Sequence, residues 1–227
     1  MKRHPLIFLA LLFAVSAIAT WGAFHCDAPL RRAVVAAQGK NWKKTENYQF
    51  HSKVRKYGDW PWLMLAGGIG LLVAWKLRRR EWLRILAAAM IASTLAGILV
   101  NASRLTTGRT RPRESPKIEQ GFYGPWHDGH LTIGNPAYNS FPSGHTATAF
   151  GFAGVVFFAC PWIGPGALVL ASVVACSSIM MGTHHLSDVV VSIIFSLAVA
   201  WFVWKWVSQR GDQACHQLRK KLHRPKK

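Results

Sequence analysis

Residues 146–183 read TATAFGFAGVVFFACPWIGPGALVLASVVACSSIMMGT and contain no Asp, Glu, Lys, Arg or His. A helix that crosses the hydrocarbon core of a bilayer needs about 20 mainly apolar residues. This stretch is therefore long enough for two such helices. The segment CPWIGPG at 160–166 interrupts it, because proline and glycine disfavour a continuous helix. The stretch predicts two membrane spans joined by a turn.

The composition of the whole chain indicates a membrane protein with basic rims. Hydrophobic residues make up 51% of the chain and charged residues only 16%, whereas soluble domains carry about 25% charged residues. The 28 Lys and Arg against 9 Asp and Glu give a net charge of +19. A disordered basic tail or a histone-like protein is excluded by so much apolar sequence. The cysteines at 26, 160, 176 and 215 lie too far apart for a disulfide framework or a zinc site, so we expect no structural disulfide and no metal cluster. No cofactor is predicted.

Four further apolar runs complete an all-α fold, a six-transmembrane helical bundle. They cover residues 6–24, 60–77, 83–100 and 189–207. The first run also resembles a cleavable signal peptide, because Ala17 and Ala19 form a small-residue cleavage pattern. We favour a retained helix, since the run is longer than a typical signal core and six spans place both basic termini on one side. The predicted domain covers 1–207, and 208–227 is expected to be a basic tail, disordered or lying on the surface.

The distribution of Lys and Arg predicts the orientation of the bundle. Basic residues crowd the termini and the turn at 76–84, whereas the connection at 182–188 has none. By the positive-inside rule both termini are cytoplasmic, and the loops 25–59, 101–145 and 182–188 lie outside. The loop 25–59 mixes basic and aromatic residues, which we interpret as a solvated loop anchored by interfacial tryptophans near anionic lipids. We expect no nucleic acid to bind there.

Three segments of these outer loops carry the candidate chemistry. The first packs Arg104, Arg109, Arg111 and Arg113 into ten residues. On an outer face the positive-inside rule disfavours such a cluster, so phosphate binding through guanidinium groups explains it better than a membrane rim does.

The second segment is FPSGHT at 141–146, where an apolar span begins. Ser143 is expected to be the N-cap, with Gly144 and His145 in the first turn. The free N–H groups of such a turn favour an anion, and His145 adds a titratable group to what could otherwise be an ordinary cap.

The third segment is THHLSD at 183–188. His184 and Asp188 stand four residues apart, so one helical turn would let the Asp188 carboxylate accept the Nδ1 proton of His184 and leave Nε2 free. An isolated pair of this kind could be two interfacial polar residues.

Together, the order Arg-x6-Arg-Pro, Pro-Ser-Gly-His and His-x3-Asp resembles the type 2 phosphatidic acid phosphatase superfamily. The resemblance implies a membrane phosphatase whose active site lies on the outer side, at the boundary between the membrane and water. It also implies a mechanism that needs no metal. It implies that Arg104 and Arg111 hold the phosphoryl oxygens, with help from the Ser143 hydroxyl and the Gly144 amide. The same resemblance makes His184 the nucleophile that forms a phosphohistidine, Asp188 its orienting carboxylate, and His145 the general acid.

One position departs from the pattern of that family. The pattern requires Ser-Arg at 177 and 178, and this chain has Ser177-Ser178. Loss of one bidentate contact to the phosphoryl group would cost roughly 2–4 kcal/mol of transition-state stabilisation. Arg109 or Arg113 are candidates to compensate, since they lie in the same basic loop.

The sequence thus predicts an enzyme that hydrolyses a lipid phosphate or diphosphate in a bacterial inner membrane, with the site facing the periplasm. Two alternatives stay open. The phosphohistidine could pass its phosphoryl group from a polyprenyl diphosphate to lipid A, or the missing arginine could leave an impaired protein that only binds phosphate.

Overall fold

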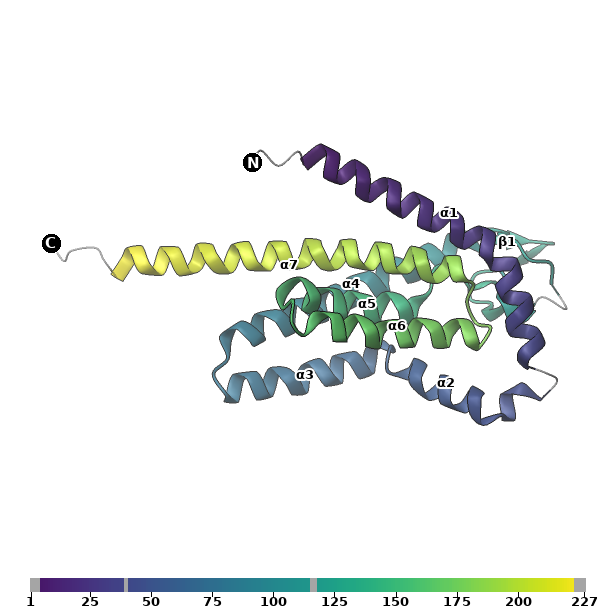
Figure 1. The fold of residues 1–227 in the computed structure, drawn as a ribbon, viewed down its shortest axis with the longest axis horizontal. Helices are drawn as coiled ribbons and strands as arrows, with labels where there is room; N and C mark the ends of the chain where they lie inside the picture. The colour runs from purple at the N-terminus through teal and green to yellow at the C-terminus, as the bar shows by residue number, and fades with distance from the viewer. Residues whose placement is uncertain (1–4, 39–40, 115–117, 223–227) are drawn as a thin grey trace.

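The computed structural model describes residues 5–38, 41–114 and 118–222. Within these ranges the chain forms seven α-helices and one short β-hairpin (Figure 1). The helices are α1 (Pro5–Gln38), α2 (Glu46–Lys56), α3 (Trp60–Lys76), α4 (Arg80–Thr107), α5 (Gly144–Ala159), α6 (Gly164–Met180) and α7 (Leu186–Leu222). The hairpin pairs β1 (Trp126–His127) with β2 (His130–Leu131).

The predicted all-α fold is confirmed, and each predicted span lies on one of these helices. Among the described residues, three segments are long and apolar enough to cross a membrane, namely Leu9–Gln38 of α1, Arg80–Thr107 of α4 and Leu186–Arg210 of α7. The two helices predicted from the uncharged stretch are shorter apolar helices, α5 and α6. They are separated at Cys160, as the proline and glycine residues of the turn require.

The segment 25–59 is not the loop that the sequence predicted. α1 continues past Phe24 to Gln38, because the segment after Phe24 is rich in alanine, the strongest helix former. A second helix, α2, follows after a short connection. The Thr45 side chain caps α2 by accepting a hydrogen bond from the Tyr48 amide at 3.3 Å, and a capped end favours helix formation.

The predicted basic tail is helical over much of its length. α7 continues to Leu222, so of the two expected forms, disordered or lying on the surface, the disordered one does not apply to residues 208–222. Residues 223–227 lie outside the described part of the chain.

Small residues allow the central helices α4, α5 and α7 to approach closely. Gly151 of α5 lies so near α4 that a Cβ atom there would stand 2.9 Å from the Ala92 carbonyl oxygen. Likewise a Cβ atom at Gly154 would stand 2.8 Å from the Cβ atom of Ala200 on α7. Interfaces of this kind are typical of membrane helices, whose backbones pack through Gly and Ala.

The two ends of the molecule contain different secondary-structure elements. Figure 1 shows the start of α1, the turn between α3 and α4 and the far part of α7 at one end. The β-hairpin and the connection from α6 to α7 lie at the opposite end. At this second end α4 finishes and α5 and α7 begin, so all three motif segments are brought together there.

Candidate active site

Arg104 lies in the last turn of α4 and reaches the first turn of α5. Its Nε donates to the Pro142 carbonyl oxygen at 2.8 Å, and its Nη1 donates to Asn101 Oδ1 at 3.1 Å. Its Nη2 is buried without a hydrogen-bond partner among the described residues. A Cβ atom at Gly144 would stand only 3.0 Å from that Nη2. The glycine of the Pro-Ser-Gly-His segment therefore makes room for the guanidinium group.

Arg111 lies on the loop after α4 and is held more loosely than Arg104. Its Nε and Nη2 make long contacts of 3.4 and 3.3 Å to the Asn139 carbonyl oxygen. Burial, together with the positive charges of Arg113, Arg104 and Arg55, lowers the pKa of Arg111 to about 10. Several guanidinium groups thus converge on one place, with little negative charge to balance them.

The start of α5 has the geometry expected for an anion site. Ser143 is the N-cap residue, as predicted, with extended backbone angles of −80° and 113°. Its side chain makes no capping bond in the described structure. Instead its Oγ accepts a hydrogen bond from Thr146 Oγ1 at 2.9 Å. The first N–H groups of α5 have no partner within the helix, so they are available to an anion.

His184 is oriented by a different group from the one the sequence predicted. Its Nδ1 lies 2.7 Å from the Ser140 carbonyl oxygen and 3.6 Å from Asp188 Oδ2. The Nδ1 proton therefore goes to the carbonyl group, with the Asp188 carboxylate nearby. The prediction assumed a helical turn across 184–188, but α7 begins only at Leu186. The consequence for chemistry is unchanged, because a proton on Nδ1 leaves the lone pair on Nε2.

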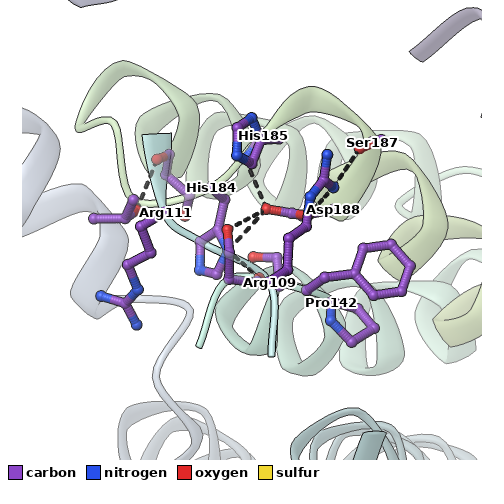
Figure 2. A network of polar contacts seen from close by, with 12 residues as sticks. Arg109, Arg111, Pro142, His184, His185, Ser187 and Asp188 are labelled. Atoms are coloured by element: carbon purple, nitrogen blue, oxygen red, sulfur yellow. Dashed lines mark hydrogen bonds and ion pairs between the residues drawn. The ribbon is translucent and has the colours of Figure 1, made fainter. Parts of the chain in front are cut away.

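Asp188 is buried at the centre of a polar network that Figure 2 shows from close by. Its Oδ2 accepts from the His185 amide at 2.7 Å and from Ser140 Oγ at 2.6 Å. The contact to the amide closes the first turn of α7, as an acidic residue does in a capping box. Asp188 thus positions both the segment that holds His184 and the loop whose carbonyl group holds the Nδ1 proton.

Arg109 does not compensate for the missing arginine, because its guanidinium group is fully engaged elsewhere. Its Nη1 pairs with Asp188 Oδ1 at 2.5 Å and its Nη2 pairs with Asp27 Oδ2 at 2.7 Å. Three phenylalanine rings surround it, with Cζ 4.7–5.7 Å from the ring centroids. Figure 2 shows the Arg109 and Arg111 guanidinium groups pointing in different directions, that of Arg109 toward Ser187 and Asp188.

Arg113, the other predicted candidate, is also paired. Its Nε contacts Glu114 Oε1 at 3.1 Å, and its side chain is 27% exposed. Ser178, at the position of the missing arginine, is buried, and its Oγ donates to the Val174 carbonyl oxygen of its own helix at 3.2 Å. Ser178 therefore supplies no donor in place of the arginine, and Arg113 is bound through its Nε to the neighbouring Glu114.

The structure adds site residues that sequence reasoning missed. Asp59 Oδ1 lies 2.5 Å from His145 Nε2, so the predicted general acid has a carboxylate partner. Asp27 of α1 binds both Arg109 and the Ser187 amide, the latter at 2.9 Å. Both are among only 9 acidic residues in the chain, and that rarity is the one signal that could have pointed to them.

The three motif segments lie within a region that is similar to known proteins. Residues 82–212 match the model of a protein family that is described as the PAP2 superfamily. A lipid A 1-phosphatase from Porphyromonas gingivalis is 30% identical over 166 residues, which cover 70% of this chain and 32% of that protein. A decaprenylphosphoryl-5-phosphoribose phosphatase from Mycobacterium tuberculosis is 32% identical over 144 residues, which cover 63% of this chain and 69% of that protein.

A solved structure shares the fold. The crystal structure of a transmembrane PAP2-type phosphatidylglycerolphosphate phosphatase from Bacillus subtilis superposes with a TM-score of 0.54 at 18% identity. The superposition covers 88% of this chain and 96% of that chain. The fold of this protein is therefore that of an integral membrane protein with transmembrane helices.

Proposed function

The chain belongs to the PAP2 superfamily, and we propose that it is a membrane phosphatase that hydrolyses a phosphate ester or anhydride of a lipid. The single observation that carries this proposal is the convergence at one end of the bundle of a nucleophile and an anion site. His184 has its lone pair on Nε2, Arg104 has an enclosed Nη2 without a partner, and the first turn of α5 begins beside that guanidinium group.

In the first step, the Nε2 lone pair of His184 attacks phosphorus and the bond from phosphorus to the lipid oxygen breaks. His145 donates a proton to that oxygen, so the lipid leaves as an alcohol or a phosphate. Arg104, Arg111 and the α5 amides stabilise the charge on the equatorial oxygens. Burial and the neighbouring arginines disfavour the protonated imidazole of His145, and the Asp59 carboxylate, 2.5 Å from its Nε2, would offset this before the transfer.

In the second step, water attacks the phosphohistidine and the bond between Nε2 and phosphorus breaks. His145, now neutral, accepts the proton from the water, and orthophosphate is released. These two easier steps replace a single hydrolysis step that would be more difficult. His184 and His145 return to their starting protonation states.

We place the protein in a bacterial inner membrane with six crossing helices, both termini in the cytoplasm and the site at the periplasmic boundary. Two features support this. The relatives act on lipids by their names, lipid A and a decaprenyl-linked sugar phosphate. The start of α1 and the far part of α7 lie at the end of the molecule opposite the site.

A direct test measures release of inorganic phosphate by the purified protein in detergent, with a metal chelator present. Phosphatidic acid, a polyprenyl diphosphate and lipid A are offered as substrates. We expect turnover of at least one of them and none in His184→Ala. Label from a polyprenyl diphosphate that arrives on lipid A would indicate transfer instead. Absence of turnover from every lipid phosphate, with retained phosphate binding, would show a binding protein.

A further inference from the structure

We propose that Arg55 of α2 binds the phosphoryl group in the place of the arginine that position 178 lacks. The inference rests on the proposed function and assigns one more residue to the same site. Arg55 comes from a segment that the sequence presented as a solvated loop. Its evidence lies in the packing of α2, in the state of its guanidinium group and in the charges around it.

α2 lies against α6 at the level of the two serines that replace the Ser-Arg pair of the family. His51 Nδ1 of α2 is 3.1 Å from Ser177 Oγ. Ser178 beside it is completely buried, and its hydroxyl group bonds within its own helix. Because both residues at this level are small, α2 can pack closely against the surface of α6.

The end of α2 is also fixed to the first turn of α5, where the anion site begins. Thr148 Oγ1 donates to the Gly58 carbonyl oxygen at 2.5 Å. A Cβ atom at Gly58 would stand 3.1 Å from the His145 carbonyl oxygen and 3.3 Å from that of Arg55, and it would collide with Val174 of α6. Only glycine allows this approach. The last turn of α2, which carries Arg55, is thereby held beside α5 and α6 at once.

The Arg55 side chain is partly buried, and its Nε is buried without a hydrogen-bond partner. No ion pair of this side chain is found among the described residues. A buried donor that is left unsatisfied is unfavourable. Arg104 Nη2, beside Gly144 at the start of α5, is also buried without a partner. One anion between them would satisfy both groups.

The charges of the neighbouring residues place Arg55 with the other phosphate-binding arginines. Burial lowers the pKa of Arg55, and the positive charge of Arg113 lowers it further, while Asp59 raises it. Arg55 in turn lowers the pKa of Arg111 together with Arg104 and Arg113. The guanidinium groups repel one another in the free protein, and a bound phosphate would relieve that repulsion. A third arginine also restores the bidentate donor that Ser178 cannot supply.

The test compares Arg55→Ala, Arg55→Lys and Lys53→Ala in the full-length protein in detergent. Lys53 is an exposed residue of the same helix and serves as the matched control. We expect kcat/KM for a lipid phosphate to fall about 100-fold in Arg55→Ala, with Arg55→Lys in between. Inhibition by inorganic phosphate should weaken about tenfold or more. Lys53→Ala should match the wild type in both measurements.

A second variant separates phosphate binding from a purely structural role. Arg55→Ala with Ser178→Arg returns a guanidinium group from the α6 side. We expect this double variant to bind inorganic phosphate more tightly than Arg55→Ala alone. Arg55→Ala with unchanged phosphate inhibition would overturn the proposal, whatever its turnover. Failure of the proposed function would look different. In that case the wild-type protein would show no turnover, or a turnover that His184→Ala leaves unchanged.

Discussion

Replacement of Arg109 by alanine tests whether this residue stabilises the fold rather than binding phosphate. The change would leave the carboxylates of Asp27 and Asp188 buried without their cation, since both now pair with Arg109 at 2.7 and 2.5 Å. Removing one partner of a buried ion pair costs about 3–5 kcal/mol. For a domain of this size, that loss corresponds to a fall in Tm of roughly 6–20 °C.

The assay is thermal unfolding of the purified protein in one detergent, followed by tryptophan fluorescence. Arg113→Ala is the matched control, because Arg113 pairs with Glu114 at a partly exposed site and such pairs contribute about 0–1 kcal/mol. We expect a large fall in Tm for Arg109→Ala and a small one for Arg113→Ala. An unchanged Tm in Arg109→Ala, with weaker inhibition by inorganic phosphate, would refute the structural role.

Three further outcomes are expected. Gly144→Ala should weaken inhibition by inorganic phosphate severalfold, because the new Cβ atom would stand 3.0 Å from Arg104 Nη2. Gly68→Ala is the control and should be neutral, because Gly68 has open space beside it. Equal effects of the two substitutions would contradict this prediction. Asp59→Asn should slow hydrolysis of lipid phosphates about 10–100-fold. Hydrolysis of an aryl phosphate should slow much less, because its good leaving group needs no proton from His145. An equal loss of activity on both substrates would indicate a structural role for Asp59. Burial lowers the pKa of His184 to about 4, against the opposing influence of Asp188, so its imidazole is neutral at pH 7. The fall of the phosphorylation rate on the acidic side, where His184 becomes protonated, should therefore be centred near pH 4; an acidic-side fall centred near 6.5 would contradict this.

The sequence predicted the helices and the three motif segments well, because long apolar runs and polar residues at their ends are local signals. His184, His145, Arg104 and Arg111 lie at one end of the bundle as expected. The Ser140 carbonyl oxygen, 2.7 Å from His184 Nδ1, was not predicted, whereas the predicted partner Asp188 lies farther away at 3.6 Å. α7 begins only at Leu186, after Gly182 in a left-handed conformation, so residues 184–188 do not form the helical turn that the prediction assumed.

The remaining site residues depend on tertiary packing that no local pattern reveals. Arg109 and Asp27 are 82 residues apart in the chain, and they meet only because α1 continues beyond its apolar run. Arg55 lies on a short polar helix whose sequence resembles an ordinary solvated surface. Its position beside α5 follows from the small residues of α6 and from Gly58, which sequence reasoning had no reason to connect.

Trapping of the covalent intermediate tests the central claim most directly. The protein is mixed with a lipid phosphate labelled on phosphorus, denatured in alkali within the first turnover, and digested for mass spectrometry. We expect label that is stable in alkali and labile in acid on the peptide containing His184, present with a chelator and lost in His184→Ala but kept in Lys53→Ala. Turnover with no such label, or label on His185 or another residue, would contradict the assignment of His184 as the nucleophile.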